Sequence, residues 1–153
     1  MTDLPVFATA DLEAVPPFAV ESFTNDDAVD LGLVAVEVIR ERGLNLAVRV
    51  ELRGDIVFVT KVGTTGPDND IWITRKSAVA REHGVPSLLV RRRLQDAGTL
   101  DEVSALDSEK AYYGGSVPIL VGGEVIGTIT ASGEPDVLDH DTAAEAVRRY
   151  LAR

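Results

Sequence analysis

Apolar and polar residues alternate most regularly between residues 44 and 61. Apolar residues occupy every second position from Leu44 to Leu52, which is the period-two pattern of a strand with one buried face. Arg53-Gly54-Asp55 supplies a turn, and a second apolar run follows at 56–61. The segment therefore predicts an antiparallel hairpin.

A second hairpin is predicted between Val117 and Ala131. Its two strands, 117–121 and 124–131, are separated by Gly122-Gly123. Consecutive glycines supply the positive φ angles that a tight primed turn requires. Four strands are thus expected, joined in pairs by short turns.

Helical spacing occupies most of the remaining chain. A helix is predicted from Asp26, a favourable N-cap, to the basic residues before Gly43. Further helices are predicted at 68–83, 87–97 and 135–153, with a short helical or turn segment at 107–112. The order α-β-β-α-α-β-β-α indicates an α+β fold, in which helices flank an antiparallel sheet of four to five strands.

The first 17 residues differ from the rest of the chain. They hold three prolines and no sustained periodicity, so we expect an irregular arm at 1–17 that docks on the domain or on a neighbour. Residues 18–153 are expected to form a single domain, since a chain of 153 residues can bury one ordinary core.

Charge and composition exclude several classes of protein. Fifteen basic and 25 acidic residues give a formal net charge of -10, which opposes binding to nucleic acid. No apolar run is long enough to span a membrane, and the start of the sequence lacks the regions of a secretory signal. The chain has no cysteine and therefore no disulfide framework, and in the absence of a secretory signal we expect a cytoplasmic protein.

The stretch from Gly63 to Lys76 holds most of the candidate site residues. Thr64 and Thr65 lie between glycines, and Pro67 with Asp70 marks the first turn of a helix. Backbone N–H groups in such a loop can hold a carboxylate or phosphate. The alternative is a strand-to-helix loop without a ligand.

Trp72 and Lys76 are predicted to share one face of this helix, because they are four residues apart. The usual outcome for such a lysine is to extend its ammonium group to solvent. The functional alternative is a fixed cation for a small acidic ligand, with help from Arg75.

Two further segments supply candidate residues. Tyr113-Gly114-Gly115 is a flexible turn that can bring backbone N–H groups close to a ligand or pack against a neighbouring subunit. His140 lies between two aspartates, which suits either acid–base chemistry or the first turn of a helix. Two histidines and no cysteine do not favour a transition-metal site.

Three blocks resemble a known family. These blocks are Gly-Pro-Asp-Asn-Asp-Ile-Trp-Ile-Thr-Arg-Lys at 66–76, Gly-Gly-Ser-Val-Pro-Ile at 114–119, and Ile-Gly-Thr-Ile-Thr-Ala-Ser-Gly at 126–133 with the following Asp139-His140. They look like the small proteins described as heme-degrading domain proteins. More remotely, the chain resembles heme-binding sensor proteins, glycolate-utilisation accessory proteins and the C-terminal domain of a cobalamin adenosyltransferase.

The resemblance implies a profilin-like fold that assembles as homodimers or larger rings. It also implies a tetrapyrrole such as heme as a candidate ligand. Tyr113 and Val85 stand where relatives commonly carry histidine. Tyrosine can also ligate heme iron.

Three functional hypotheses follow, and the sequence leaves open whether the protein is an enzyme. The first is a binding module for a small acidic ligand or tetrapyrrole. The second is a heme-degrading oxidoreductase in which His140 or Tyr113 contacts iron or acts as acid. The third is a structural or adaptor oligomer. The candidate ligand-binding residues are Thr64, Thr65, Asp70, Trp72, Arg75, Lys76, Tyr113, Gly114, Gly115 and His140.

Overall fold

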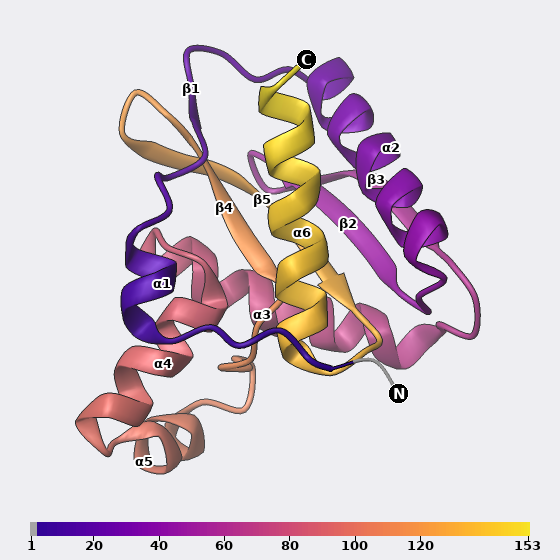
Figure 1. Cartoon of the computed structure of the whole chain (residues 1–153). Helices are drawn as coiled ribbons and strands as arrows, with labels where there is room; N and C mark the ends of the chain where they lie inside the picture. The colour runs from indigo at the N-terminus through magenta and orange to yellow at the C-terminus, as the bar shows by residue number, and fades with distance from the viewer. Residues whose placement is uncertain (1–2) are drawn as a thin grey trace.

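A five-stranded sheet in the order β1-β4-β5-β2-β3 organises the chain (Figure 1). The computed structural model describes residues 3–153. The strands are β1 (Ala19–Val20), β2 (Ala47–Leu52), β3 (Asp55–Lys61), β4 (Ser116–Val121) and β5 (Glu124–Ser132). The helices are α1 (Thr9–Glu13), α2 (Asn25–Arg42), α3 (Pro67–His83), α4 (Ser87–Ala97), α5 (Leu100–Leu106) and α6 (Asp136–Leu151).

Both predicted hairpins are present. β2 pairs antiparallel with β3, and the turn between them places Arg53 and Gly54 at positive φ. β4 pairs antiparallel with β5 across Gly122 and Gly123, whose φ angles are 60° and 80°. Positive φ at both central residues matches the right-handed twist of the strands, which explains the two glycines. The predicted α+β class is confirmed.

β1 adds a fifth strand that the sequence pattern did not reveal. Ala19 and Val20 pair in parallel with Leu120 and Val121 of β4. A strand of two residues is too short to show a period of two. The sheet is therefore mostly antiparallel, with one parallel edge.

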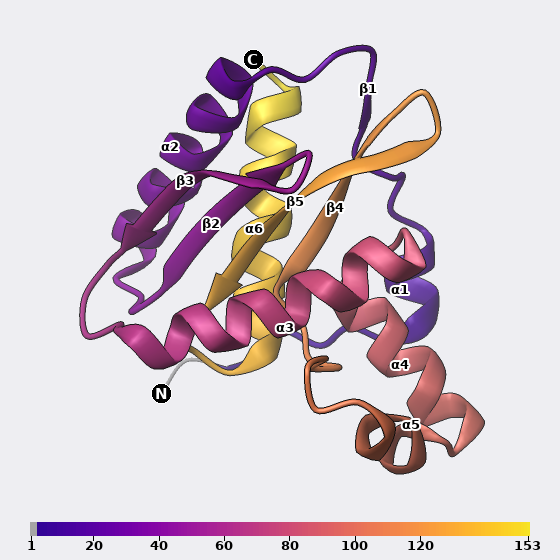
Figure 2. The same ribbon diagram turned by 180° about the vertical axis from the view of Figure 1, so that it is seen from behind.

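Helices cover both faces of the sheet. α2 and α6 lie side by side on one face, and α3 crosses the other face (Figures 1 and 2). The main apolar core fills the space between the sheet and the α2–α6 layer, where Leu31, Ile39, Val48 and Ile129 are fully buried. This arrangement leaves one end of α3 close to the start of α6.

The first hairpin differs from its prediction in one respect. Residues 44–52 were expected to bury one face only, but β2 is buried on both faces because α3 covers the second. As a result Arg49 is only 5% exposed. Its guanidinium donates to Thr74 Oγ1 over 3.0 Å and pairs with Glu51 over 3.4 Å.

Two helical predictions need correction. The N-terminal arm is not wholly irregular, because Thr9–Glu13 forms one short helix that places Leu12 against Leu88 and Leu89. The segment at 107–112, predicted as a short helix or turn, contains a turn, and the helix that precedes it at Leu100–Leu106, with Asp107 as its C-cap, was not predicted. In the part of the chain from residue 3 onward, no helix is long and apolar enough to cross a membrane.

Candidate functional site

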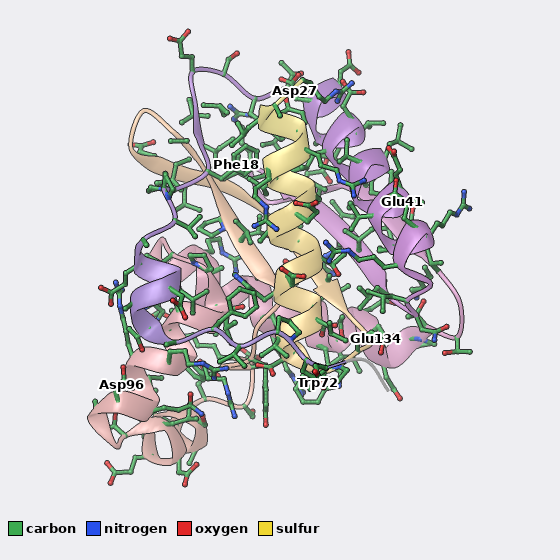
Figure 3. The ribbon with its side chains drawn as sticks, in the orientation of Figure 1. Phe18, Asp27, Glu41, Trp72, Asp96 and Glu134 are labelled. Carbon is green, nitrogen blue, oxygen red and sulfur yellow. The ribbon has the colours of Figure 1, made fainter. Side chains whose placement is uncertain are left out.

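A pocket of about 410 Å³ lies where α3 meets the start of α6. Three parts of the chain surround it: α3, the turn before β4, and the segment that joins β5 to α6. Its lining comprises Asn69, Trp72, Lys76, Tyr113, Ser132, Gly133, Glu134, Pro135, Asp136 and Asp139. Figure 3 labels Trp72 and Glu134, which lie near each other at the N-terminal end of α6.

A buried ion pair forms the inner wall of this pocket. Lys76 Nζ lies 2.7 Å from Asp139 Oδ2 and also donates to the carbonyl oxygen of Ala131 over 3.1 Å. Lys76 is 3% exposed and Asp139 is 2% exposed. The expectation that Lys76 extends to solvent is therefore wrong, because α6 brings a carboxylate directly to its ammonium group.

Two features of its surroundings act in opposite directions on the pKa of the Asp139 carboxyl. Burial raises the pKa of its carboxyl to about 6, although the Lys76 ammonium acts in the opposite direction. Asp139 Oδ1 also accepts a hydrogen bond from the backbone N–H of Glu134 over 3.0 Å. The side chain thus holds together α3, α6 and the loop after β5.

Two aromatic rings form the outer wall. Trp72 and Tyr113 meet edge to face, with centroids 5.7 Å apart and an interplanar angle of 86°. Both residues are 41% exposed, so each ring keeps surface for a ligand. The guanidinium of Arg91 lies 4.3 Å from the centroid of the Tyr113 ring and fixes that ring in place.

Gly114 and Gly115 bring the turn against α6 and β5. The N–H of Gly114 donates to Asp136 Oδ2 over 2.9 Å. Gly115 has a φ of 137°, and a Cβ atom there would lie 2.4 Å from the carbonyl oxygen of Ala131 and 3.0 Å from Lys76 Nζ. Only glycine fits this close approach.

The structure brings part of the predicted site together. Trp72, Lys76 and Tyr113 line the pocket, and Gly114 and Gly115 lie directly behind it. Their role in binding a ligand stays a prediction.

The other predicted site residues lie elsewhere. Thr64 and Thr65 make local contacts, through the Thr64 N–H to Asn45 Oδ1 and the Thr65 hydroxyl to Val62 O. Asp70 and Arg75 line a separate hollow of about 530 Å³.

His140 is buried and lies outside the pocket lining. It packs edge to face against Phe7, with ring centroids 5.0 Å apart. Burial lowers the pKa of its imidazole to about 4, and its Nδ1 has no hydrogen-bond partner among residues 3–153. A neutral imidazole beneath the N-terminal arm is not positioned for acid–base chemistry in the pocket.

The candidate ligand-binding residues chosen from the sequence did not include Asn69, Ser132, Glu134, Asp136 or Asp139. All five residues line the pocket. The available signal was the polar run Ser-Gly-Glu-Pro-Asp at 132–136, which directly follows an apolar strand. Among the residues that the structure describes, no three histidine or acidic side chains are grouped to hold a metal ion.

Comparison with known proteins identifies the family. The family profile described as "Haem degrading protein HbpS-like" matches residues 23–148. The chain belongs to this HbpS-like family. A UPF0303 protein of Streptomyces coelicolor is 42% identical over 132 residues, which cover 84% of each chain.

Solved structures share the fold of this HbpS-like chain. The crystal structure of the Ybr137w protein superposes with a TM-score of 0.79 at 28% identity, covering 89% of this chain and 83% of that one. The crystal structure of a PduOC:heme complex gives a TM-score of 0.72 at 18% identity, covering 83% and 94% of the two chains. At that identity the similarity concerns the fold.

Proposed function

We propose that this protein is a small-molecule-binding module whose ligand occupies the pocket between α3 and the start of α6. The observation that carries the proposal is the half-exposed Trp72–Tyr113 pair, which stands over the buried Lys76–Asp139 pair. A pocket of about 410 Å³ with aromatic walls and a few fixed polar groups has the usual character of a small-molecule site.

The three sequence blocks that carry the family resemblance support this location. The block at 66–76 supplies Trp72 and Lys76, the block at 114–119 supplies the diglycine turn, and Asp139 follows the third. Segments far apart in the sequence thus meet at one place. A structural or adaptor protein needs no such convergence.

Heme is a candidate ligand to test, because a protein of the same fold was solved as a PduOC:heme complex. The flat ring suits the aromatic wall, but Tyr113 is the one lining residue of a type that ligates heme iron. Glu134 and Asp136 would oppose the propionate groups of heme, whereas the charge of Asp139 is compensated by Lys76. The lining therefore does not fit heme, and we derive no oxidoreductase step from it.

The sequence also predicted a small acidic ligand, and that prediction required the ammonium group of Lys76 to be free to bind it. The charge of Lys76 is instead compensated by Asp139 at 2.7 Å. Among the described residues that line the pocket, no unpaired lysine is left to attract an anion.

Trp72 makes the proposal directly testable, because it is the only tryptophan of the chain. We expect 2-phenylethanol, a small neutral aromatic probe, to change Trp72 fluorescence in a saturable manner. Tyr113→Leu should weaken this binding, whereas His83→Leu, an exposed position on the same helix, should not. The absence of any saturable response would overturn the pocket as a binding site.

A hemin titration separates this proposal from the heme alternative. We expect Tyr113→Phe to leave the Soret band of added hemin unchanged, because we do not assign an iron ligand to Tyr113. A Soret shift that is lost in Tyr113→Phe would favour heme as the ligand.

Self-association and a cytoplasmic location are part of the same proposal. β3 is an edge strand, and its Ile56 and Val59 side chains are exposed. An exposed apolar edge strand favours pairing with another chain. The expected partner is a second copy of this protein, and the location stays a prediction.

A further inference from the structure

The charges around the pocket do not balance. Among the residues from 3 onward that line it, Glu134, Asp136 and Asp139 supply three carboxylates and Lys76 supplies the single ammonium group. Asp139 and Lys76 neutralise each other at 2.7 Å, which leaves Glu134 and Asp136.

Neither remaining carboxylate is fully used by the protein. Glu134 Oε2 accepts from the backbone N–H of Asn45 over 2.8 Å, and Asp136 Oδ2 accepts from the N–H of Gly114 over 2.9 Å. Arg91 Nε forms an ion pair with Asp136 Oδ2 at 3.9 Å, too long for a hydrogen bond, so it compensates only part of this charge. Within residues 3–153, Glu134 Oε1 and Asp136 Oδ1 have no hydrogen-bond partner, so each can accept from a ligand.

Two features of the surroundings bear on the sign of the ligand charge. The N-terminus of α6 faces this region and would by itself attract an anion, but Asp136 and Asp139 in its first turn already provide negative charge there. The aromatic wall has the opposite preference, because ring faces attract cations. Arg91 over Tyr113 shows that a cation is accommodated beside this wall.

We propose that the pocket selects ligands that join an aromatic or other flat apolar group to a protonated amine. This inference rests on the proposed function. Trp72 and Tyr113 contact the apolar group, and Glu134 and Asp136 accept hydrogen bonds from the ammonium group. Carboxylate ligands are disfavoured, because their charge would face Glu134 and Asp136, while Lys76 is already paired with Asp139 and Arg91 with Asp136.

Three probes of similar size and different charge test this selectivity. They are phenethylammonium, neutral 2-phenylethanol and 3-phenylpropanoate, and Trp72 fluorescence reports the binding of each. We expect phenethylammonium to bind about tenfold more tightly than 3-phenylpropanoate, with the alcohol between them, as two partly exposed carboxylates imply. The preference should shrink as salt is added.

Variants assign the preference to specific side chains. Glu134→Gln and Asp136→Asn keep an oxygen for the N–H groups of Asn45 and Gly114, so the fold should be retained. Combining both variants should bring the amine and the acid to within about twofold of each other. Asp70→Asn, which removes an acidic group outside the pocket, should leave the preference unchanged.

The outcomes separate this inference from the proposed function. Binding of 3-phenylpropanoate as tight as that of phenethylammonium, with 2-phenylethanol still bound, overturns the charge selectivity alone. An amine preference that persists in the doubly substituted protein also overturns it. Failure of all three probes to bind overturns the pocket itself.

Discussion

Lys76 and Asp139 are both almost fully buried, so the stability of each charge depends on the other. Removing one partner of a buried pair leaves an uncompensated charge in a poorly solvated place. The same substitution at the surface leaves a charge that water solvates. Two residues of the same type can therefore differ greatly in how much their substitution lowers the free energy of unfolding.

Lys76→Met should destabilise the protein by about 3–5 kcal/mol, since Asp139 would lose its counter-ion. Urea unfolding at neutral pH measures this change. Lys61→Met is the matched control, because Lys61 pairs with Asp70 in a much more exposed position and should contribute less than about 1 kcal/mol. Equal effects of the two variants would contradict the buried-pair assignment.

The neighbours Asp139 and His140 should give opposite pH dependences of stability. The pKa of Asp139 is raised to about 6, so its contribution is present below its ordinary pKa of 3.8 and is lost as pH rises through 6. The pKa of His140 is lowered to about 4, so its contribution is present above 6.5 and is lost as pH falls through 4. Each contribution is about 3 kcal/mol. Between pH 4 and 6 the stability lost through Asp139 as pH rises is nearly matched by the stability gained through His140.

His140→Phe should remove one side of this balance. The variant should then lose stability as pH rises from about 4 to about 6, where the contributions of Asp139 and His140 in the original chain offset each other. Urea unfolding at a series of pH values gives the slope. His83→Phe, at an exposed position, should keep the original slope, and an unchanged slope in His140→Phe would refute the argument.

At the scale of secondary-structure elements, the turn before β4 determines how closely α3 and α6 approach. Gly115 lies between the carbonyl oxygen of Ala131 and the ammonium group of Lys76. The N–H of Ala131 also donates to Gly115 O over 2.9 Å. The turn is thus tied to β5 and to the ion pair together.

Gly115→Ala should destabilise the protein by about 3 kcal/mol or more, because the new Cβ collides with backbone at an unfavourable φ. Gly122→Ala is the control, since Gly122 also has positive φ but a Cβ added there would meet no atom within 4 Å. The control should cost about 1 kcal/mol. Thermal unfolding of both variants compares them, and similar losses would show that φ alone matters at Gly115.

The N-terminal arm is held to the domain by both apolar and polar contacts. Leu12 packs on Leu88 and Leu89, and Arg92 donates to the carbonyl oxygen of Phe7. We expect Leu12→Ala to destabilise the protein by about 2–3 kcal/mol through lost burial. Leu4→Ala, at an exposed position of the same arm, should have almost no effect on urea unfolding.

The elements of the fold were largely predictable because each depends on nearby residues. Alternation and glycine turns identified both hairpins, and helical spacing with start and stop residues identified α2, α3, α4 and α6, although the N-cap of α2 is Thr24 and not the predicted Asp26. β1 was missed because its partner is about 100 residues away and the strand has only two residues. The burial of Arg49 was missed because a single strand does not reveal which helix will cover its second face.

The same limit applies to the site. The helical spacing placed Trp72 beside Lys76, but nothing local identifies Asp139 as the partner of Lys76, 63 residues later. His140 was a candidate because it lies between two aspartates, yet helix geometry turns neighbouring side chains in different directions. Contacts between distant segments were therefore the part that sequence periodicity did not supply.

At the scale of the whole molecule, the net charge of -10 and the exposed edge of β3 have opposite effects on association. We expect light scattering to show a mass above 16.4 kDa that increases with added salt, which screens the repulsion. Val59→Lys should favour the monomer, whereas Val6→Lys in the arm should not. A monomer in all cases would exclude self-association through this edge.

The position of α5 has a practical consequence. No side chain of this helix is buried, and it lies beyond α4, away from the sheet (Figure 1). Since the chain has no cysteine, Ser104→Cys on this helix would give a unique thiol for attaching a dye. Energy transfer from the indole across the molecule would then report ligand occupancy without altering the cavity.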